Sequence, residues 1–363
     1  MSAYINNYEV LCDAGDVKSL MEAIYDKKSA LSVDTDYLEG TPAGLGKMEY
    51  DNIFNVLKDI TSKVLEQSNL EDFSKTVLIL GSSVGGMQEC EEIFYRDMNY
   101  ENIDPNRYSI NTLSDFLQEE FGFYDARGLS TACTSSANAL LLAKRLIDVD
   151  AYDSVVVVGA DGLCKSTVLG FSALGVLSDK PCVPFDESRN GMNVAEAVGV
   201  ILIQNEKTED SVELKGVGAS SDAYHMTNPD PEATGAMSSM GNAIADAGLS
   251  KEDIDYVNAH GTATIANDRV ESLAIEKLFG DSVFVSSTKA ITGHTLGAAG
   301  AIEAIISCEA IKNSKVPPQT GLKNQENLNI KIPTKSVEMN VKYIVSNSFA
   351  FGGNNTSIIL GAV

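Results

Sequence analysis

Residues 128–139 read Gly128-Leu129-Ser130-Thr131-Ala132-Cys133-Thr134-Ser135-Ser136-Ala137-Asn138-Ala139, and an apolar run follows at 140–143. Small hydroxyl residues before an apolar run predict the start of a helix. The N-terminus of a helix carries a partial positive charge and free N–H groups, which favour a thiolate over a thiol. Cys133 is therefore a candidate nucleophile. For a cysteine taken alone, a buried structural role is the stronger interpretation, so the rest of the chain has to decide.

The composition bounds the class of protein. The 363 residues are 44% hydrophobic and 21% charged, which is typical of a water-soluble globular protein with two domains or halves. No stretch is long and apolar enough to span a membrane, and residues 1–10 lack the pattern of a secretion signal. We therefore expect a cytoplasmic protein with no membrane partner. The formal net charge of -24 argues against nucleic acid as a partner, because nucleic-acid binding needs a basic surface.

Cysteines and histidines are few. The six cysteines are scattered without a Cys-x-x-Cys spacing, which argues against a metal site or a disulfide framework and favours reduced thiols. The three histidines are His225, His260 and His294. Two of them fall inside motifs, which is informative because so few are available.

Strands and helices alternate in two successive halves. Short apolar runs predict strands at 4–11, 76–80, 155–158, 198–203, 212–217, 254–258, 283–286, 343–346 and 356–360. Helices are predicted at 17–26, 53–64, 111–121, 231–247, 268–279 and 296–311, and a loop rich in glycine at 33–47. The polar segment 204–210 predicts a boundary between one half at 1–207 and another at 208–363. This pattern favours a layered α/β fold with a duplicated plan.

The first histidine motif is His-Gly-Thr-Ala-Thr at 260–264. His260 directly follows the strand predicted at 254–258, and side chains at the carboxyl ends of strands form the sites of α/β proteins. Taken alone, a histidine in this place is about as often structural as catalytic.

The second motif lies at 287–300, where Lys289 and His294 bracket a turn and four small residues open the next helix. Small residues allow close approach of a backbone or a ligand, and tight helix packing explains some of them.

The third motif, at 346–355, joins the last two predicted strands. Phe349 and Phe351 beside two glycines can form a flexible apolar flap. A glycine-rich hairpin with core aromatic residues explains the same pattern.

Together, Cys133, His260 and His294 form a set of one nucleophile and two imidazoles at strand ends. A neutral histidine can donate an N–H to a developing oxyanion. Two such donors beside a thioester carbonyl would stabilise an enolate.

These motifs resemble those of the elongating β-ketoacyl-acyl-carrier-protein synthases of the thiolase superfamily. The similarity covers residues 4–360 and is densest at 130–139, 184–197, 256–271 and 287–304. It implies two pseudo-repeated halves in a layered αβαβα architecture. It also implies decarboxylative Claisen condensation of an enzyme-bound acyl thioester with malonyl-acyl-carrier-protein, to give 3-oxoacyl-acyl-carrier-protein. The partners implied are an acyl carrier protein and either a second copy or a second ketosynthase-like subunit. No cofactor or metal of its own is implied, because phosphopantetheine arrives on the carrier.

The resemblance assigns catalytic roles to five residues. Cys133 matches the nucleophile that accepts the acyl chain. His260 and His294 match the pair that binds the malonyl thioester carbonyl and promotes decarboxylation. Lys289 matches the lysine beside them, and Glu271 matches its acidic partner.

Three further residues receive binding roles from the resemblance. Thr262 and Thr264 match hydroxyls that hydrogen-bond the phosphopantetheine arm. The backbone N–H groups of Cys133 and Phe351 match an oxyanion hole, and Phe351 matches a gate to the acyl pocket.

Several features depart from the family pattern. Ala350 stands where glycine is expected, which predicts a stiffer gate, and Ile265 stands where proline is common. The region 33–50, which carries basic docking residues in relatives, is short, and with the net charge of -24 it predicts unusual carrier docking. These departures point away from the housekeeping fatty-acid enzyme and towards a specialised pathway, such as polyketide or aryl-polyene synthesis.

Two other functions compete with a catalytic synthase. A chain-length-factor-like partner subunit usually lacks the cysteine, whereas this chain keeps Cys133 and both histidines. A thiolase needs a second cysteine in the C-terminal loop, and a priming synthase usually has asparagine at the place of His294, so both are disfavoured.

Overall fold

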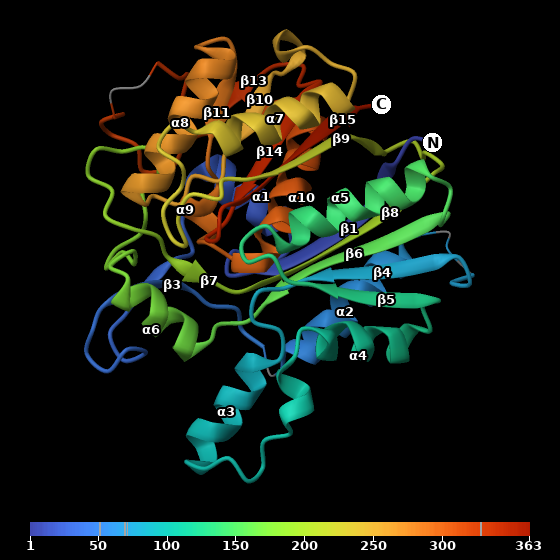
Figure 1. The fold of residues 1–363 in the computed structure, drawn as a ribbon, viewed down its shortest axis with the longest axis vertical. Coiled ribbons are helices and arrows are strands. Elements are labelled where there is room, and N and C mark those ends of the chain that lie inside the picture. The colour runs from blue at the N-terminus through green and yellow to red at the C-terminus, as the bar shows by residue number, and fades with distance from the viewer. Residues whose placement is uncertain (51, 69, 71, 327–328) are drawn as a thin grey trace.

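One ten-stranded sheet runs through the whole molecule in the computed structural model, which describes residues 1–363 apart from 51, 69, 71 and 327–328 (Figure 1). The strand order is β11-β10-β14-β15-β9-β1-β8-β6-β4-β5. Its strands are β1 (Tyr4–Cys12), β4 (Thr76–Gly81), β5 (Asp125–Leu129), β6 (Ser154–Asp161), β8 (Ala197–Gln204), β9 (Val212–Ser221), β10 (Tyr256–Asn258), β11 (Phe284–Ser286), β14 (Tyr343–Phe349) and β15 (Asn354–Ala362).

Each half of the chain contributes five of these strands with the same topology. In chain order the first half supplies β1, β4, β5, β6 and β8, and the second supplies β9, β10, β11, β14 and β15. If the five strands of each half are numbered along the chain, their order across the sheet is first, fifth, fourth, second and third in both halves. The pattern of parallel and antiparallel pairs is also the same. The halves join where β1 pairs with β9 through Tyr4↔Glu213 and Ile5↔Val212. The prediction of a duplicated α/β plan is confirmed.

The helices are α1 (Val17–Asp26), α2 (Ile53–Glu66), α3 (Met87–Asp97), α4 (Asn111–Phe121), α5 (Ser135–Asp148), α6 (Lys165–Ala173), α7 (Thr234–Asp246), α8 (Ile265–Phe279), α9 (Lys289–Thr292) and α10 (Ala299–Lys312). Short 3-10 turns lie at Pro105–Tyr108, Lys251–Asp253 and Leu296–Ala298. Among the described residues, no helix combines the length and the apolar character needed to cross a membrane.

Helices and sheet halves form alternating layers (Figure 1). Helices α5 and α10 lie in the middle layer and share one core with β1, β8 and β14. Helices α2 and α4 cover the outer face of the first half, and α7 and α8 cover the outer face of the second. Strand β6 is buried on both faces, since Val155 and Val157 belong to the middle core and Val156 and Val158 to the outer one. Burial on both faces explains its continuous valine run.

The two middle helices approach each other closely. A Cβ atom at Gly300 of α10 would lie 2.5 Å from the backbone nitrogen of Ala137 on α5. The neighbouring Ala301 N–H donates to Ser136 Oγ at 2.9 Å. The small residues that open both helices therefore serve helix packing, and this packing brings the two helix N-termini together.

Some local structure differs from the sequence prediction. The loop expected at 33–47 contains β2 (Ser32–Asp34) and β3 (Ala43–Gly46), which join β7 (Val194–Ala195) in a separate sheet. The sequence pattern did not predict several further elements. These are the two-stranded sheet of β12 (Lys315–Val316) and β13 (Val337–Glu338), the edge strand β5, and helices α3 and α6. Strand β5 has the sequence Asp-Ala-Arg-Gly-Leu and pairs on one side only, so no apolar run marks it. The proposed boundary after residue 207 falls in the connection between β8 and β9 and stays a prediction.

The helix packing can be tested by adding single methyl groups. Gly300→Ala should lower the free energy of unfolding by about 1–3 kcal/mol, because the methyl group meets the backbone of α5. In the matched control, Gly241→Ala on α7 has nothing within 4 Å of the new Cβ. This control should raise the free energy of unfolding by about 0.4–1 kcal/mol through helix propensity. Urea unfolding followed by circular dichroism measures both, and equal stability of the two variants would contradict the packing.

Candidate active site

Cys133 lies between the end of β5 and the start of α5. The preceding residue, Ala132, has a left-handed backbone with φ 54°. Thr134 Oγ1 donates to the Thr131 carbonyl at 2.7 Å, and Ser135 Oγ donates to the Ala132 carbonyl at 2.6 Å. These hydroxyls fasten a tight turn that presents Cys133 just before the helix, which explains why small hydroxyl residues surround it.

One cavity of about 260 Å³ contains most of the site predicted from the sequence. Predicted site residues that line it are Cys133, His260, Thr262, Thr264, His294 and Phe351. Lys289 and Glu271 are buried and do not appear in its lining. The structure thus gathers residues from both halves of the chain into one place.

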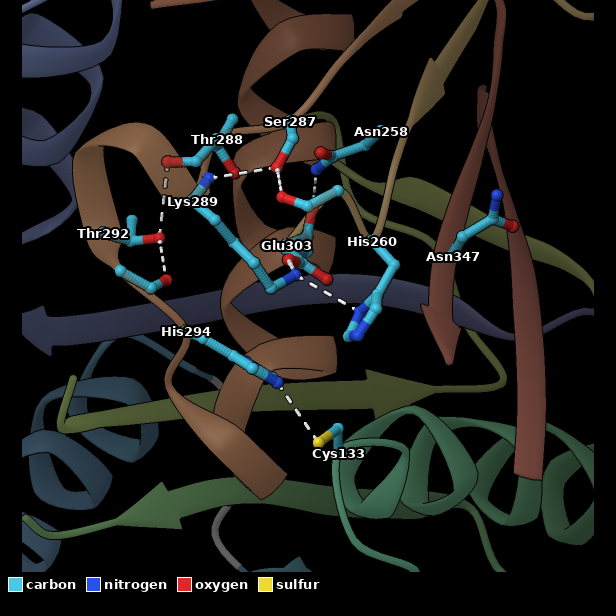
Figure 2. A network of polar contacts seen from close by, with 12 residues as sticks. Cys133, Asn258, His260, Ser287, Thr288, Lys289, Thr292, His294, Glu303 and Asn347 are labelled. Carbon is cyan, nitrogen blue, oxygen red and sulfur yellow. Dashed lines mark hydrogen bonds and ion pairs between the residues drawn. The ribbon is translucent and has the colours of Figure 1, made fainter. Parts of the chain in front are cut away.

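The thiol and the two imidazoles converge (Figure 2). His294 Nε2 lies 3.1 Å from Cys133 Sγ. The His260 and His294 rings meet edge to face, with centroids 5.2 Å apart. The backbone N–H of His294 donates to the Asn193 carbonyl at 2.7 Å, which fixes the loop before α10. Cys133 precedes α5 and His294 precedes α10, so nucleophile and imidazole come from corresponding places in the duplicated halves.

Lys289 determines which nitrogen of His260 carries hydrogen. Its Nζ lies 3.4 Å from His260 Nδ1. An ammonium group has donors only, so Nδ1 accepts and the hydrogen of the neutral ring is on Nε2. The same Nζ forms a buried ion pair with Glu303 (Figure 2). The prediction that Glu271 is the acidic partner of Lys289 is therefore wrong, and the partner is Glu303.

Glu271 has a different function in the fold. Its carboxylate accepts the backbone N–H groups of His260 and Gly261, both at 2.8 Å, and the Asn347 side-chain amide at 3.1 Å. Glu271 lies on α8 in the outer layer, whereas Glu303 lies on α10 in the middle layer beside Lys289. The signal for Glu303 was present, because it is the one acidic residue within the apolar stretch 296–308.

Asp161, at the end of β6, also escaped the sequence analysis. Its carboxylate accepts the N–H groups of Ser83 and Val84 at 2.9 Å and that of Gly297 at 2.6 Å. It therefore fastens the turn after β4 to the start of the segment leading into α10. Burial raises the pKa of Asp161 to about 6, and these hydrogen bonds oppose the shift. An acidic residue ending an all-apolar strand was the available signal.

Burial dominates the electrostatics of the reactive groups. It lowers the pKa of His260 and His294 well below 6.5, and the charge of Lys289 lowers both further. Burial also raises the pKa of the Cys133 thiol to about 12, while Lys289 and the backbone N–H groups of Cys133 and Phe351 lower it. Loss of solvation thus opposes the effect expected from the helix N-terminus and favours the thiol over the thiolate. A neutral thiol can donate its hydrogen to Nε2 of a neutral His294 ring across the 3.1 Å contact.

Two threonines and one turn form other walls of the cavity. Thr262 Oγ1 and Thr264 Oγ1 are 2.9 Å apart, and Thr264 also caps α8. Phe351 lies in the turn between β14 and β15, with its ring centroid 6.0 Å from that of Phe171. The Ala350 N–H donates across this turn to Asn354 at 2.8 Å. A stiffer gate at Ala350 and the roles of these residues stay predictions.

No group of three or more histidine, cysteine, aspartate or glutamate side chains is arranged to hold a metal ion in the part of the chain that the structure describes.

The duplicated fold and the cysteine with two histidines define a condensing enzyme of the thiolase type. The N-terminal domain of beta-ketoacyl synthase matches residues 12–209, and the C-terminal domain matches residues 211–323. The chain belongs to the beta-ketoacyl synthase family and is an acyltransferase that forms carbon–carbon bonds.

Curated relatives agree with this assignment. The chain is 36% identical over 320 residues to 3-oxoacyl-acyl-carrier-protein synthase 2 of Coxiella burnetii, covering 78% of this chain and 74% of that protein. It is 34% identical over 316 residues to the enzyme of the same name from Rhizobium meliloti, covering 80% of this chain and 75% of that protein.

Solved structures show the same fold. The ketosynthase ApeO in complex with its chain length factor ApeC, from Xenorhabdus doucetiae, matches with a TM-score of 0.91 and 32% identity, covering 100% of this chain and 98% of that chain. A beta-ketoacyl synthase from Burkholderia phymatum matches with a TM-score of 0.90 and 24% identity, covering 100% and 99%, and this likeness concerns the fold alone. The predicted family, layered fold and enzyme class are confirmed.

Double-mutant cycles can distinguish the two candidate partners of Lys289. Lys289→Met and Glu303→Gln should each cost about 3–5 kcal/mol of unfolding free energy, since each leaves a buried charge unpaired. The double variant should lose less unfolding free energy than the sum of the two single losses, by at least about 1 kcal/mol. The cycle of Lys289→Met with Glu271→Gln should show coupling below about 0.5 kcal/mol. Chemical unfolding of the wild type, the three single variants and the two double variants gives both coupling energies, and larger coupling to Glu271 than to Glu303 would reverse our assignment.

Proposed function

We propose that this β-ketoacyl synthase holds an acyl chain on Cys133 and condenses it with malonyl-acyl-carrier-protein. The products are carbon dioxide and 3-oxoacyl-acyl-carrier-protein. The observation that carries the proposal is the 3.1 Å contact between Cys133 Sγ and His294 Nε2 beside the second imidazole of His260. A thiol that faces two neutral imidazoles fits both acyl transfer and enolate stabilisation.

The first step transfers the acyl group. Cys133 Sγ attacks the carbonyl carbon of the acyl-carrier thioester while its proton moves to His294 Nε2, the base within hydrogen-bond distance. The bond to the phosphopantetheine sulfur breaks, and that thiolate takes the proton. Cys133 then carries the acyl group as a thioester, and the carrier leaves with a free thiol.

The second step breaks the malonyl C–COO⁻ bond. The electron pair of that bond forms an enolate on the thioester while carbon dioxide leaves. His260, whose Nδ1 faces Lys289, presents Nε2–H to the enolate oxygen. Once Cys133 is acylated it no longer donates to His294 Nε2, so exchange with water can remove the hydrogen from Nδ1 and place one on Nε2, which makes the neutral His294 ring a second donor. Because burial keeps both rings neutral, they donate without placing a permanent cation in the cavity.

The third step forms the new carbon–carbon bond. The enolate carbon attacks the acyl carbonyl on Cys133, and the resulting oxyanion accepts hydrogen bonds from the backbone N–H groups of Cys133 and Phe351. Support for this assignment is that both N–H groups lower the pKa of the Cys133 thiol, so both lie close to the reacting group. Collapse of this intermediate breaks the C–S bond. Cys133 leaves as a thiolate and takes one proton from solvent, which restores the thiol.

The cavity walls explain how the substrates are held. Thr262 and Thr264 offer paired hydroxyls to the amide groups of phosphopantetheine, and Phe351 separates this arm from the acyl side. We propose that the chain needs no resident cofactor, since the reactive sulfur of the donor arrives on the carrier. Fatty-acid or specialised polyketide and aryl-polyene synthesis both use this chemistry.

We also propose that the enzyme works as a dimer, with a second copy or with a second ketosynthase-like subunit. The support for a second type of subunit is the solved complex of ApeO with its chain length factor ApeC, which this chain resembles over its whole length. A purely non-catalytic, chain-length-factor-like role is disfavoured because Cys133, His260 and His294 are present and converge in one cavity.

Acylation of the cysteine is the direct test. Wild-type protein incubated with acyl-carrier-protein should gain the mass of one acyl group, and Cys133→Ala should gain none and form no 3-oxoacyl product. In the matched control, Cys90→Ala removes a thiol on α3 that lies outside the cavity lining, and it should acylate normally. Intact-mass spectrometry measures all three, and full acylation of Cys133→Ala would overturn the proposal.

The pH dependence tests the electrostatics. Acylation requires neutral His294, whose pKa lies well below 6.5, so the rate should stay constant as pH falls through 6.5 and decline only below it. Lys289→Met removes a positive charge that lowers the pKa of both histidines. In this variant, the fall of the acylation rate at acidic pH should therefore begin at a higher pH than in the wild type. Stopped-flow acylation with a small acyl thioester between about pH 5 and about pH 8 measures both profiles. If the wild-type rate instead fell with a midpoint at the ordinary histidine pKa, the conclusion that burial keeps His294 neutral would be contradicted.

A further inference from the structure

Three large apolar side chains are exposed around the mouth of the Cys133 cavity. Leu174, directly after α6, is 51% exposed, Met226 is 80% exposed, and Ile265 at the start of α8 is 55% exposed. Ile265 lines the cavity itself, and the chain neighbours Gly175 and His225 of the other two also line it. We call Leu174, Met226 and Ile265 the apolar rim.

The carboxylate side chains at this mouth give it negative charge. Among the described residues that line the cavity there is no lysine or arginine, and Asp222 is the acidic one. The loop at 222–233 adds Asp230 and Glu232 and contains no lysine or arginine. The surface that surrounds the entrance therefore lacks the positive charge that would attract an acidic partner.

The cations on the neighbouring elements are mostly paired. Lys165 at the start of α6 forms an ion pair with Glu39 at 2.8 Å. Arg269, one turn after Ile265 on α8, forms an ion pair with Glu326 at 2.9 Å. Lys180 is exposed, but it follows Asp179 directly in the chain. Ion pairs with a partner would have to compete with these internal ones.

We infer that the carrier protein docks on this mouth chiefly through the apolar rim and not through ion pairs. The inference rests on the proposed function, because it requires a substrate tethered to phosphopantetheine. An arm that reaches Cys133 past Thr262 and Thr264 must enter here, so its attachment point lies against the rim. A permanent subunit on the rim would cover this entrance, whereas a carrier covers it only during each transfer. Burial of the exposed apolar side chains against the carrier removes them from water and so favours binding.

The experiment compares a carrier-bound substrate with a carrier-free one. Leu174→Glu and Met226→Glu, which change side chains outside the cavity lining, should lower kcat/KM for acyl-carrier-protein by about tenfold or more, because each places a charge in an apolar contact. With acyl-pantetheine, kcat/KM should change less than about twofold, since no carrier docks. The conservative variants Leu174→Met and Met226→Leu should restore carrier activity. Val149→Glu, at a 70% exposed position just after α5, is the matched control and should leave both activities unchanged.

Salt separates apolar from ionic docking. The KM for acyl-carrier-protein should vary less than about threefold between about 50 mM and about 500 mM sodium chloride, because apolar contacts are not screened. A steep rise of KM with salt, or a larger effect of Lys180→Ala than of Leu174→Glu, would overturn the inference. Equal losses with both substrates, or a change in the mass of the assembly by light scattering, would overturn it as well. Wild-type protein that uses neither substrate would instead contradict the proposed function.

Discussion

The packing of α5 against α10 is the constraint on which the rest of the structure depends. Gly300 allows the backbone of one helix to approach Ala137 on the other, and the Ser136 hydroxyl joins them by a hydrogen bond. Because the two helices occupy corresponding positions in the duplicated halves, their N-termini meet at the middle of the molecule. Cys133 and His294 precede these N-termini, so the same packing that closes the core also assembles the reactive pair.

Burial gives this assembled site its chemical character. The cavity excludes enough water to keep the thiol protonated and both imidazoles neutral. The ammonium of Lys289, buried with Glu303, orients His260 and adds a fixed positive charge behind it. The carboxylate of Glu271 holds the backbone of the same histidine from the opposite layer. Each charged residue near the site thus acts on a particular atom of a reactive side chain or of its loop.

The entrance to the site carries acidic side chains, among them Asp222, which lines the cavity. The chain has 27 lysine and arginine residues against 51 aspartate and glutamate residues, and Lys165 on α6 and Arg269 on α8 are engaged in internal ion pairs. Exposed apolar side chains occupy the same border. We therefore infer that a partner is selected at this surface by shape and apolar contact more than by long-range electrostatic attraction.

The sequence by itself determined the duplicated α/β plan and most strands and helices, because local periodicity carries that information. Motif spacing made Cys133, His260 and His294 candidates. The resemblance that these motifs carry gave the family and added Lys289, Thr262, Thr264 and Phe351. It could not reveal the edge strand β5, whose residues lack an apolar run, or the protonation of Cys133, which depends on burial. Only the tertiary structure decided that Lys289 pairs with Glu303 and not with Glu271. The physical reason is that the two carboxylates lie on helices of different layers, and distance along the chain says nothing about which layer faces the lysine.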